Sequence, residues 1–184
     1  MSVIASAELT DGVPTQWFPI DHGFLSWNYD PHAAVSTITL TPAGTLTVVA
    51  LKVNGGLVSK VTYDVTTAGV TLTTGESFVA LYQNGVLLGS SADQSVAWAS
   101  AGIQNTSLVS PVFVPSGIVY AAFVYSGTTG PTLAAAATPL GNVGFLAASA
   151  RYGTANTGVT TSLPASLATI SALSAHEAPW VAVS

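Results

Sequence analysis

The titratable side chains that could act together lie in one stretch of the chain, IDHGFLSWNYDPH (residues 20–32). It contains two acid–histidine pairs, Asp21 with His22 and Asp30 with His32, which could hold a metal ion or activate a nucleophile. Their spacing matches neither a zinc-binding HExxH helix nor an EF-hand loop. Each acid opens a turn-forming sequence, Asp-His-Gly or Asp-Pro, so we interpret the four side chains as turn-capping groups of an extended segment.

No other motif predicts a catalytic centre. The serine-rich GSSADQS (residues 89–95) lacks the G-x-S-x-G nucleophile elbow, and the chain has no glycine-rich phosphate loop. Glu76 and Asp93 bracket an apolar hairpin and could form a carboxylate pair for glycoside hydrolysis, but we interpret them as solvated strand ends. The sequence therefore predicts a protein that is not an enzyme, with no catalytic residue, no metal site and no cofactor.

Aromatic side chains are the remaining candidates for a binding function. Tryptophan is enriched at binding hot spots because it buries a large area with few rotors. For the tryptophans outside the strand-rich middle, an interface role and packing onto the body of the protein both stay open. The interface candidates are Trp17, Phe18, His22, Trp27, Tyr29 and Trp180. The candidates for stacking against a glycan, in an alternative interpretation, are Trp98, Tyr125 and Tyr152.

Charge is unusually scarce. Charged residues make up 6 % of the 184 residues, against about 25 % in typical globular proteins. The three basic residues, Lys52, Lys60 and Arg151, are too few to neutralise a nucleic-acid backbone or to hold the chain on an anionic membrane surface. The mean hydropathy of +0.55 is high, but the chain lacks the run of about 18 apolar residues that a membrane-spanning helix needs. The absence of cysteine excludes disulfides and thiolate metal sites.

Short β-rich segments follow one another from Ser36 onward. Turn signals roughly every 8 to 12 residues predict an all-β protein, an antiparallel jelly-roll-like β-sandwich. We divide the chain into an extended N-terminal arm (1–36), a β-sandwich domain (37–160) and a partly irregular C-terminal tail (161–184) that packs on the domain or on a neighbour. Within this tail, residues 162–179 carry leucines at helical spacing among many serines and threonines, so a helix and a loop with a strand both stay open.

One of these segments alternates along its length. In LVSKVTYDV (residues 57–65), the period of two predicts Val58, Lys60, Thr62 and Asp64 on one face of a strand. Leu57, Ser59, Val61 and Tyr63 would then point to the other face.

The hairpin SFVALYQNGVLLGSSADQS (residues 77–95) has no charged side chain from Ser77 to Ala92. Its Asn84-Gly85 centre tolerates positive φ at both positions and predicts a type I′ turn. Phe78, Ala80 and Tyr82 would share one face of the first strand, with apolar residues on the other face as well. We therefore expect the facing sheet to cover one face, and the N-terminal arm or a neighbouring subunit to cover the other.

Residues 61–133 resemble a β-sandwich module in virion proteins of tailed phages that infect actinobacteria. The resemblance lies in the TTAG turn, the VALYQNGVLLG hairpin and the SADQSVAW segment, and HGFLSWNYDP resembles the lead-in of such modules. It implies a non-enzymatic structural role in a virion and self-association, and it supplies no catalytic residue.

The chain has no collagen-like repeat and no coiled coil of the kind that extends tail fibres. We therefore expect a capsid decoration protein at the virion surface, assembled in the host cytoplasm and docked to the major capsid protein or other virion proteins through its arm. Copies would associate as a homo-oligomer, with a trimer favoured. The alternative is a tail-tip or tail-fibre module that recognises host glycan.

Overall fold

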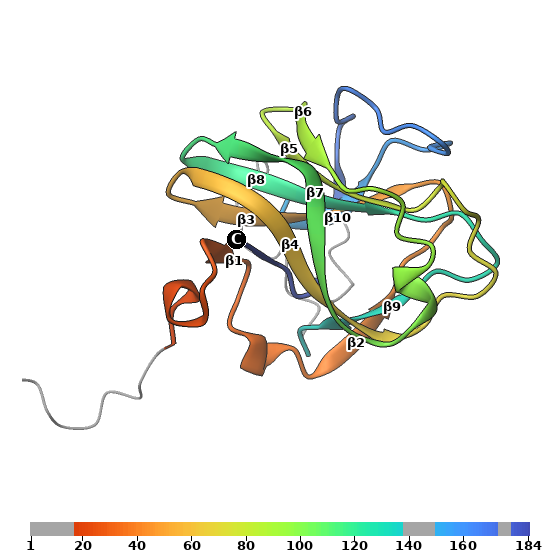
Figure 1. Cartoon of the computed structure of the whole chain (residues 1–184), viewed down its shortest axis with the longest axis horizontal. Helices are drawn as coiled ribbons and strands as arrows, with labels where there is room; N and C mark the ends of the chain where they lie inside the picture. The colour runs from red at the N-terminus through yellow and green to blue at the C-terminus, as the bar shows by residue number, and fades with distance from the viewer. Residues whose placement is uncertain (1–16, 138–149, 173–177) are drawn as a thin grey trace, which may run out of the picture.

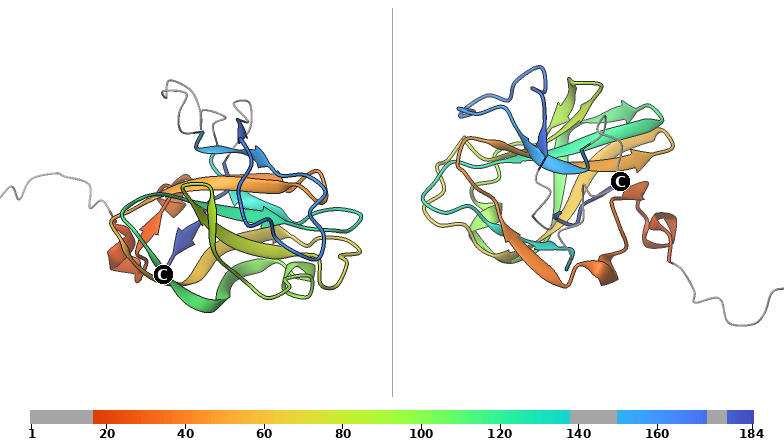
Figure 2. Two further views of the ribbon diagram at one scale, coloured as in Figure 1. Left: turned by 90° about the horizontal axis from the view of Figure 1, so that it is seen from above. Right: turned by 180° about the vertical axis from the view of Figure 1, so that it is seen from behind.

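The computed structural model describes residues 17–137, 150–172 and 178–184. Within these ranges the strands form two six-stranded antiparallel sheets that pack face to face (Figures 1 and 2). The prediction of an all-β, antiparallel sandwich is therefore confirmed. The helical elements of the described residues are short 3-10 turns, and none is long and apolar enough to cross a membrane.

The first sheet, sheet A, has the strand order β1-β12-β4-β9-β2, and β7 also pairs with β4. It brings both ends of the described chain together, because β1 pairs with β12 and β12 pairs with β4. Sheet A consists of β1 (Ser26–Trp27), β2 (Ser36–Thr39), β4 (Gly56–Thr67), β7 (Gly102–Val114), β9 (Thr132–Ala135) and β12 (Ala182–Val183).

The second sheet, sheet B, has the order β11-β10-β3-β8-β5-β6. The continuous apolar run of β8 lies between β3 and β5, as expected of a strand that is covered on both faces. Sheet B consists of β3 (Leu46–Val53), β5 (Phe78–Gln83), β6 (Val86–Ser90), β8 (Gly117–Val124), β10 (Tyr152–Ala155) and β11 (Ser171–Ala172).

The main core lies between the two sheets. Val79 and Leu81 of β5 point inward and pack in one cluster with Val61 and Tyr63 of β4. The ring of Tyr63 meets the ring of Phe123 edge to face, with 5.1 Å between their centroids. Burying each such side chain stabilises the fold by about 1.5–3 kcal/mol.

The uncharged hairpin forms as predicted. Asn84 and Gly85 have φ values of 52° and 78°, and they link Gln83 to its partner Val86 in a two-residue turn. These positive φ values are those that a type I′ turn requires. The alternation of β5 is also confirmed, since Ala80 and Tyr82 belong to a second cluster on the opposite face from Val79 and Leu81.

The second cluster corrects the expectation of what covers this outer face. Neither the described part of the N-terminal arm nor a neighbouring subunit is needed, because the chain's own C-terminal region packs there. Val159 is buried in this cluster, and Leu163, Leu167 and Ile170 pack against it. The hydroxyl of Tyr82 donates to the carbonyl oxygen of Pro164 at 2.9 Å. In Figure 1 this blue segment lies beside β6.

The alternation predicted for residues 57–65 is wrong at its start. The pairing of β4 with β7 shifts register between Val58 and Lys60, which marks a β-bulge. Val58 is therefore buried in the main core together with Val61, while Leu57 is exposed. Beyond the bulge, Lys60 and Asp64 share the outer face as predicted.

The division into arm, domain and tail stays a prediction, and residues 1–16 and 173–177 of the arm and tail lie outside the described residues. Both flanking segments nevertheless contribute strands to sheet A. Residues 162–172 contain β11 and irregular backbone but no helix. In Figures 1 and 2 the C-terminal end lies beside the N-terminal segment.

Candidate functional site: an aromatic pocket on the N-terminal segment

Two short turns shape the segment from residue 17 to residue 34, and an aspartate caps each of them. The Phe18 N–H donates to the Asp21 carboxylate at 2.8 Å across the 3-10 turn η1 (Pro19–His22). The His32 N–H donates to Oδ1 of Asp30 at 2.8 Å, at the start of η2 (Pro31–Ala33). The prediction that both acids cap turns is therefore confirmed.

The chain's own C-terminal strand holds this segment in place. The side chain of Asn28 donates to the Pro179 carbonyl at 2.7 Å and accepts from the Val181 N–H at 3.0 Å. The Tyr29 hydroxyl donates to the Ala178 carbonyl at 2.9 Å, and the indole N–H of Trp180 donates to the Tyr29 carbonyl at 3.0 Å. Burial raises the pKa of Tyr29 above its ordinary value of 10, so this hydroxyl stays a donor into the alkaline range.

A row of aromatic rings, which we call the aromatic ladder, runs from the surface to the interior of this segment. Trp17 meets His22 edge-on at 5.4 Å between centroids, and His22 meets Trp27 at 5.6 Å. Phe24 then links Trp27 to Trp180, at 6.5 and 6.1 Å. Aromatic pairs at such separations stabilise a structure by about 0.5–1.5 kcal/mol beyond the area they bury.

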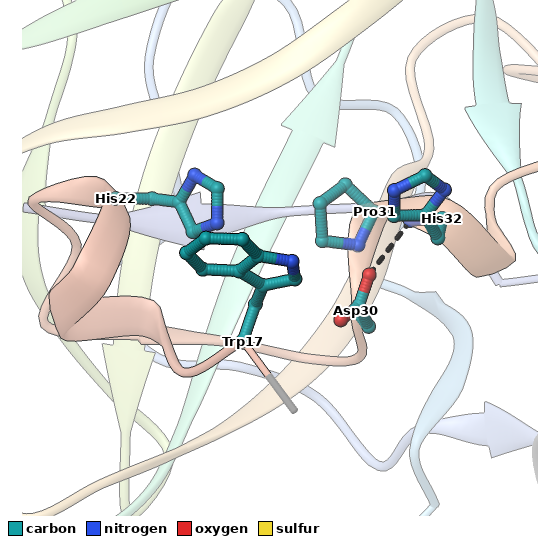
Figure 3. Close-up of a pocket in the computed structure, with 5 residues that line it drawn as sticks. All are labelled: Trp17, His22, Asp30, Pro31 and His32. Atoms are coloured by element: carbon teal, nitrogen blue, oxygen red, sulfur yellow. Dashed lines mark hydrogen bonds between the residues drawn. The ribbon is translucent and has the colours of Figure 1, made fainter. Parts of the chain in front are cut away.

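The outer end of the ladder opens into a pocket of about 280 Å³, lined by Trp17, His22, Asp30, Pro31 and His32. Figure 3 shows the indole of Trp17 beside His22, with Asp30 and His32 at the other side. Its walls combine the flat indole of Trp17 and the apolar pyrrolidine ring of Pro31 with a carboxylate and two imidazoles. The volume is close to the lower limit of about 300 Å³ for small-molecule sites. A pocket of this volume has room for no more than one small group.

The interface candidates separate into three groups by exposure. Trp17 and Phe18 are 50 and 56 % exposed, and His22 is exposed beside them. Trp27 and Tyr29 are half-buried, whereas Trp180 is buried. The outer three can therefore contact a partner, while Trp180 serves the packing of the segment onto the body.

The glycan-stacking candidates are contradicted by their burial. Trp98 is fully buried, and Tyr125 and Tyr152 are also buried, so none of them presents a ring face to a sugar. Trp98 instead donates its indole N–H to the Tyr63 hydroxyl at 2.7 Å inside the core. Sequence reasoning could not separate a surface tryptophan from one on a short 3-10 turn, η3 (Ala97–Ala99), whose side chain is buried in the main core.

The Asp93 carboxylate near the hairpin organises a loop. The Asp93 carboxylate accepts hydrogen bonds from the Ser77 N–H at 3.1 Å and from the N–H and hydroxyl of Ser95. Burial acts to raise the pKa of Asp93, but the hydrogen bonds from Gly75, Ser95 and Ser77 outweigh it and hold this pKa below its ordinary value of 3.8. A carboxylate that stays ionised in this way is unsuited to the general acid of a glycosidase.

The acid–histidine pairs do not converge on a metal site. In the part of the chain that the structure describes, no group of three or more histidine, aspartate or glutamate side chains is placed to hold a metal ion. The sequence identified four of the residues around the pocket region but missed Pro31 as a wall and Phe24 as a member of the ladder. The available signal was the density of rings, since six of the thirteen residues from 17 to 29 are aromatic or histidine.

Comparison with known proteins adds no identity. No protein-family model matches the chain, and no curated protein gives a significant match to its sequence.

Proposed function

We propose that this chain is a non-enzymatic structural protein of a tailed-phage virion, a capsid decoration protein that docks through its N-terminal segment and associates with copies of itself. The resemblance of residues 61–133 supports the virion role. One structural observation supports the docking role: the segment is fixed to the body by β12, yet Trp17, Phe18 and Ile20 are 50, 56 and 77 % exposed. A rigidly held set of exposed large apolar side chains is typical of a pre-organised contact surface.

The test is to mix the purified protein with undecorated capsids and to measure co-sedimentation. Binding should fall at least about tenfold for Trp17→Ala and for Phe18→Ala, because truncating a hot-spot aromatic costs about 2 kcal/mol or more. Val96→Ala is the matched control, since Val96 is an exposed apolar residue distant in sequence from the segment. Failure of the wild-type protein to bind capsids at any salt concentration would exclude the decoration role.

The pocket favours one alternative function, host recognition by a tail-tip module that binds a cell-surface glycan. The flat ring of Trp17 beside the polar edges of Asp30 and His32 is an arrangement that a sugar ring can use. Titration with cell-wall glycan fragments, followed by tryptophan fluorescence, should then show saturable binding that Trp17→Ala abolishes. A screen without hits, together with capsid binding, would leave the decoration role as the function.

A further inference from the structure

The outer face of sheet A carries a second exposed surface, distinct from the aromatic pocket. Val61 and Tyr63 of β4 point into the core, so Lys60, Thr62 and Asp64 between and beside them point outward. Their paired residues on the neighbouring strand β7 are residues 107, 105 and 103, in that order. Paired residues on neighbouring strands point to the same side, so these two strands form one outer face.

This β4–β7 face has exposed apolar side chains at both ends. Leu57 lies opposite Phe113 at one end, and Ile103 lies opposite Asp64 at the other. Leu57, Ile103 and Phe113 are 64, 68 and 67 % exposed. Single exposed apolar residues are common, but large ones paired across neighbouring strands mark a contact surface.

The neighbouring surfaces of sheet A are less accessible to a partner than this face. Trp27 of β1 lies opposite Ala182 of β12 on the same outer side, and the aromatic ladder covers that part of sheet A. The outer edge of β7 is bridged to Ser91 at Leu108 and is interrupted by Pro111, which has no N–H to donate to an added strand. A partner therefore meets the β4–β7 face rather than extending the sheet at its edge.

The charges on this face are ordered so that the face is complementary to itself. Lys60 and Asp64 are four residues apart, roughly 13 Å along the strand, which is too far for an ion pair within one copy. Thr62 lies midway; it is itself buried, and it donates to the exposed side chain of Asn105 at 2.9 Å. A two-fold axis through this central pair would place Lys60 of each copy over Asp64 of the other.

We propose that a second copy of this chain covers the β4–β7 face about a two-fold axis that crosses the Thr62–Asn105 pair. The two Lys60–Asp64 ion pairs set the register. Leu57 and Phe113 of each copy then lie toward the end of the other copy's β4–β7 face that carries Ile103. Contacts of this isologous kind are the commonest in homo-oligomers. The inference rests on the self-association in the proposed function, and it replaces the trimer expected from the sequence with a two-fold pair.

Charge reversal tests the proposal by sedimentation velocity over a range of concentrations at low salt. Lys60→Asp and Asp64→Lys should each raise the dissociation constant at least roughly tenfold, because like charges then face each other twice. The double variant K60D/D64K should restore association, since the opposite charges meet again. An equimolar mixture of the two single variants should form a mixed pair. Lys52→Asp is the control for the same charge change on an exposed residue of sheet B, and it should leave association unchanged.

The proposal is overturned if the wild-type chain stays monomeric, if its mass corresponds to a trimer, or if K60D/D64K associates no better than the single variants. Thermal unfolding of each variant shows that the fold is intact, so loss of association is not loss of structure. The capsid test stands apart from this one. Pairs that form without capsid binding would refute the decoration role alone, and capsid binding by a monomer would refute the two-fold contact alone.

Discussion

At the residue scale, a buried relay of hydrogen bonds explains why Trp98 belongs to the core. The indole N–H of Trp98 donates to the Tyr63 hydroxyl, which lies 2.7 Å from the hydroxyl of Thr106. Thr106 in turn donates to the side-chain oxygen of Gln94 at 3.0 Å. Burial raises the pKa of Tyr63 to about 12, which keeps its proton in place. The relay satisfies polar groups that would otherwise be costly to bury.

Removing one hydroxyl should therefore destabilise the fold. We expect Tyr63→Phe to lower the free energy of unfolding by about 1–3 kcal/mol, because the Trp98 N–H is left buried without an acceptor. Urea unfolding followed by circular dichroism measures this change. The control is Tyr120→Phe, whose half-buried hydroxyl donates to the Ala150 carbonyl at 3.1 Å. An equal loss in both variants would contradict the relay.

Asp93 should make stability depend on pH. Its pKa in the folded protein lies below the ordinary value of 3.8, so the ionised carboxylate stabilises the fold. This contribution is fully present above the unfolded-state pKa and is lost as the pH falls through the lower folded-state pKa. We expect the melting temperature of Asp93→Asn to lie below that of the wild type at pH 7, with the gap narrowing as the pH falls below 3.8. A gap that stays constant down to pH 2, or that equals the gap of Glu76→Gln throughout, would contradict this assignment.

At the element scale, the segment from residue 159 to residue 170 covers the outer face of sheet B through side chains and backbone alike. The Leu87 N–H donates to the Ala165 carbonyl at 3.0 Å, and the Leu167 N–H donates to the Gly85 carbonyl at 2.8 Å. These bonds tie the segment to the β5–β6 hairpin. They also explain why the helical spacing of its leucines does not produce a helix, since its backbone groups pair with the hairpin rather than with each other.

We expect Leu167→Ser to lower the free energy of unfolding by about 1–3 kcal/mol, because it removes apolar area from the second cluster. Chemical unfolding measures the loss. Val96→Ser is the matched control, since Val96 is 81 % exposed, and surface changes of this kind stay within about 0.5 kcal/mol. If both variants lose the same stability, the segment is not part of the core.

Local patterns allowed the fold class, the Asn84-Gly85 turn and the aspartate caps to be predicted, because each depends on neighbouring residues. The bulge between Val58 and Lys60 escaped prediction because it depends on how two strands of unequal length pair. The pocket was predicted only in part. Its acids and histidines form a visible cluster in the sequence. The hydrogen bonds from residues 178–183 that hold the pocket segment in place join parts of the chain about 150 positions apart, and no local pattern encodes such a contact.

At the scale of the whole molecule, the N-terminal segment and the C-terminal strand stabilise each other. Asn28→Ala removes both hydrogen bonds between the Asn28 side chain and the segment of Pro179 and Val181. We expect amide hydrogen exchange of residues 24–30 to become at least about tenfold faster, since local opening costs less once these bonds are lost. The exchange of β8 should not change, because it lies in the other sheet.

Asn54→Ala, at an exposed position between β3 and β4, is the control. Equal acceleration in β8 would indicate global destabilisation instead of local release.

The place of β12 between β1 and β4 also sets an order of events during synthesis. Within the described residues β1 pairs with β12 alone, so it has no partner until residues 182–183 leave the ribosome. At about 5–20 residues per second, the intervening chain takes roughly 8–30 s to make. During that interval the nascent segment with Trp17 and Phe18 lacks its strand partner, and the contact surface it carries acquires its final shape only as β12 enters sheet A.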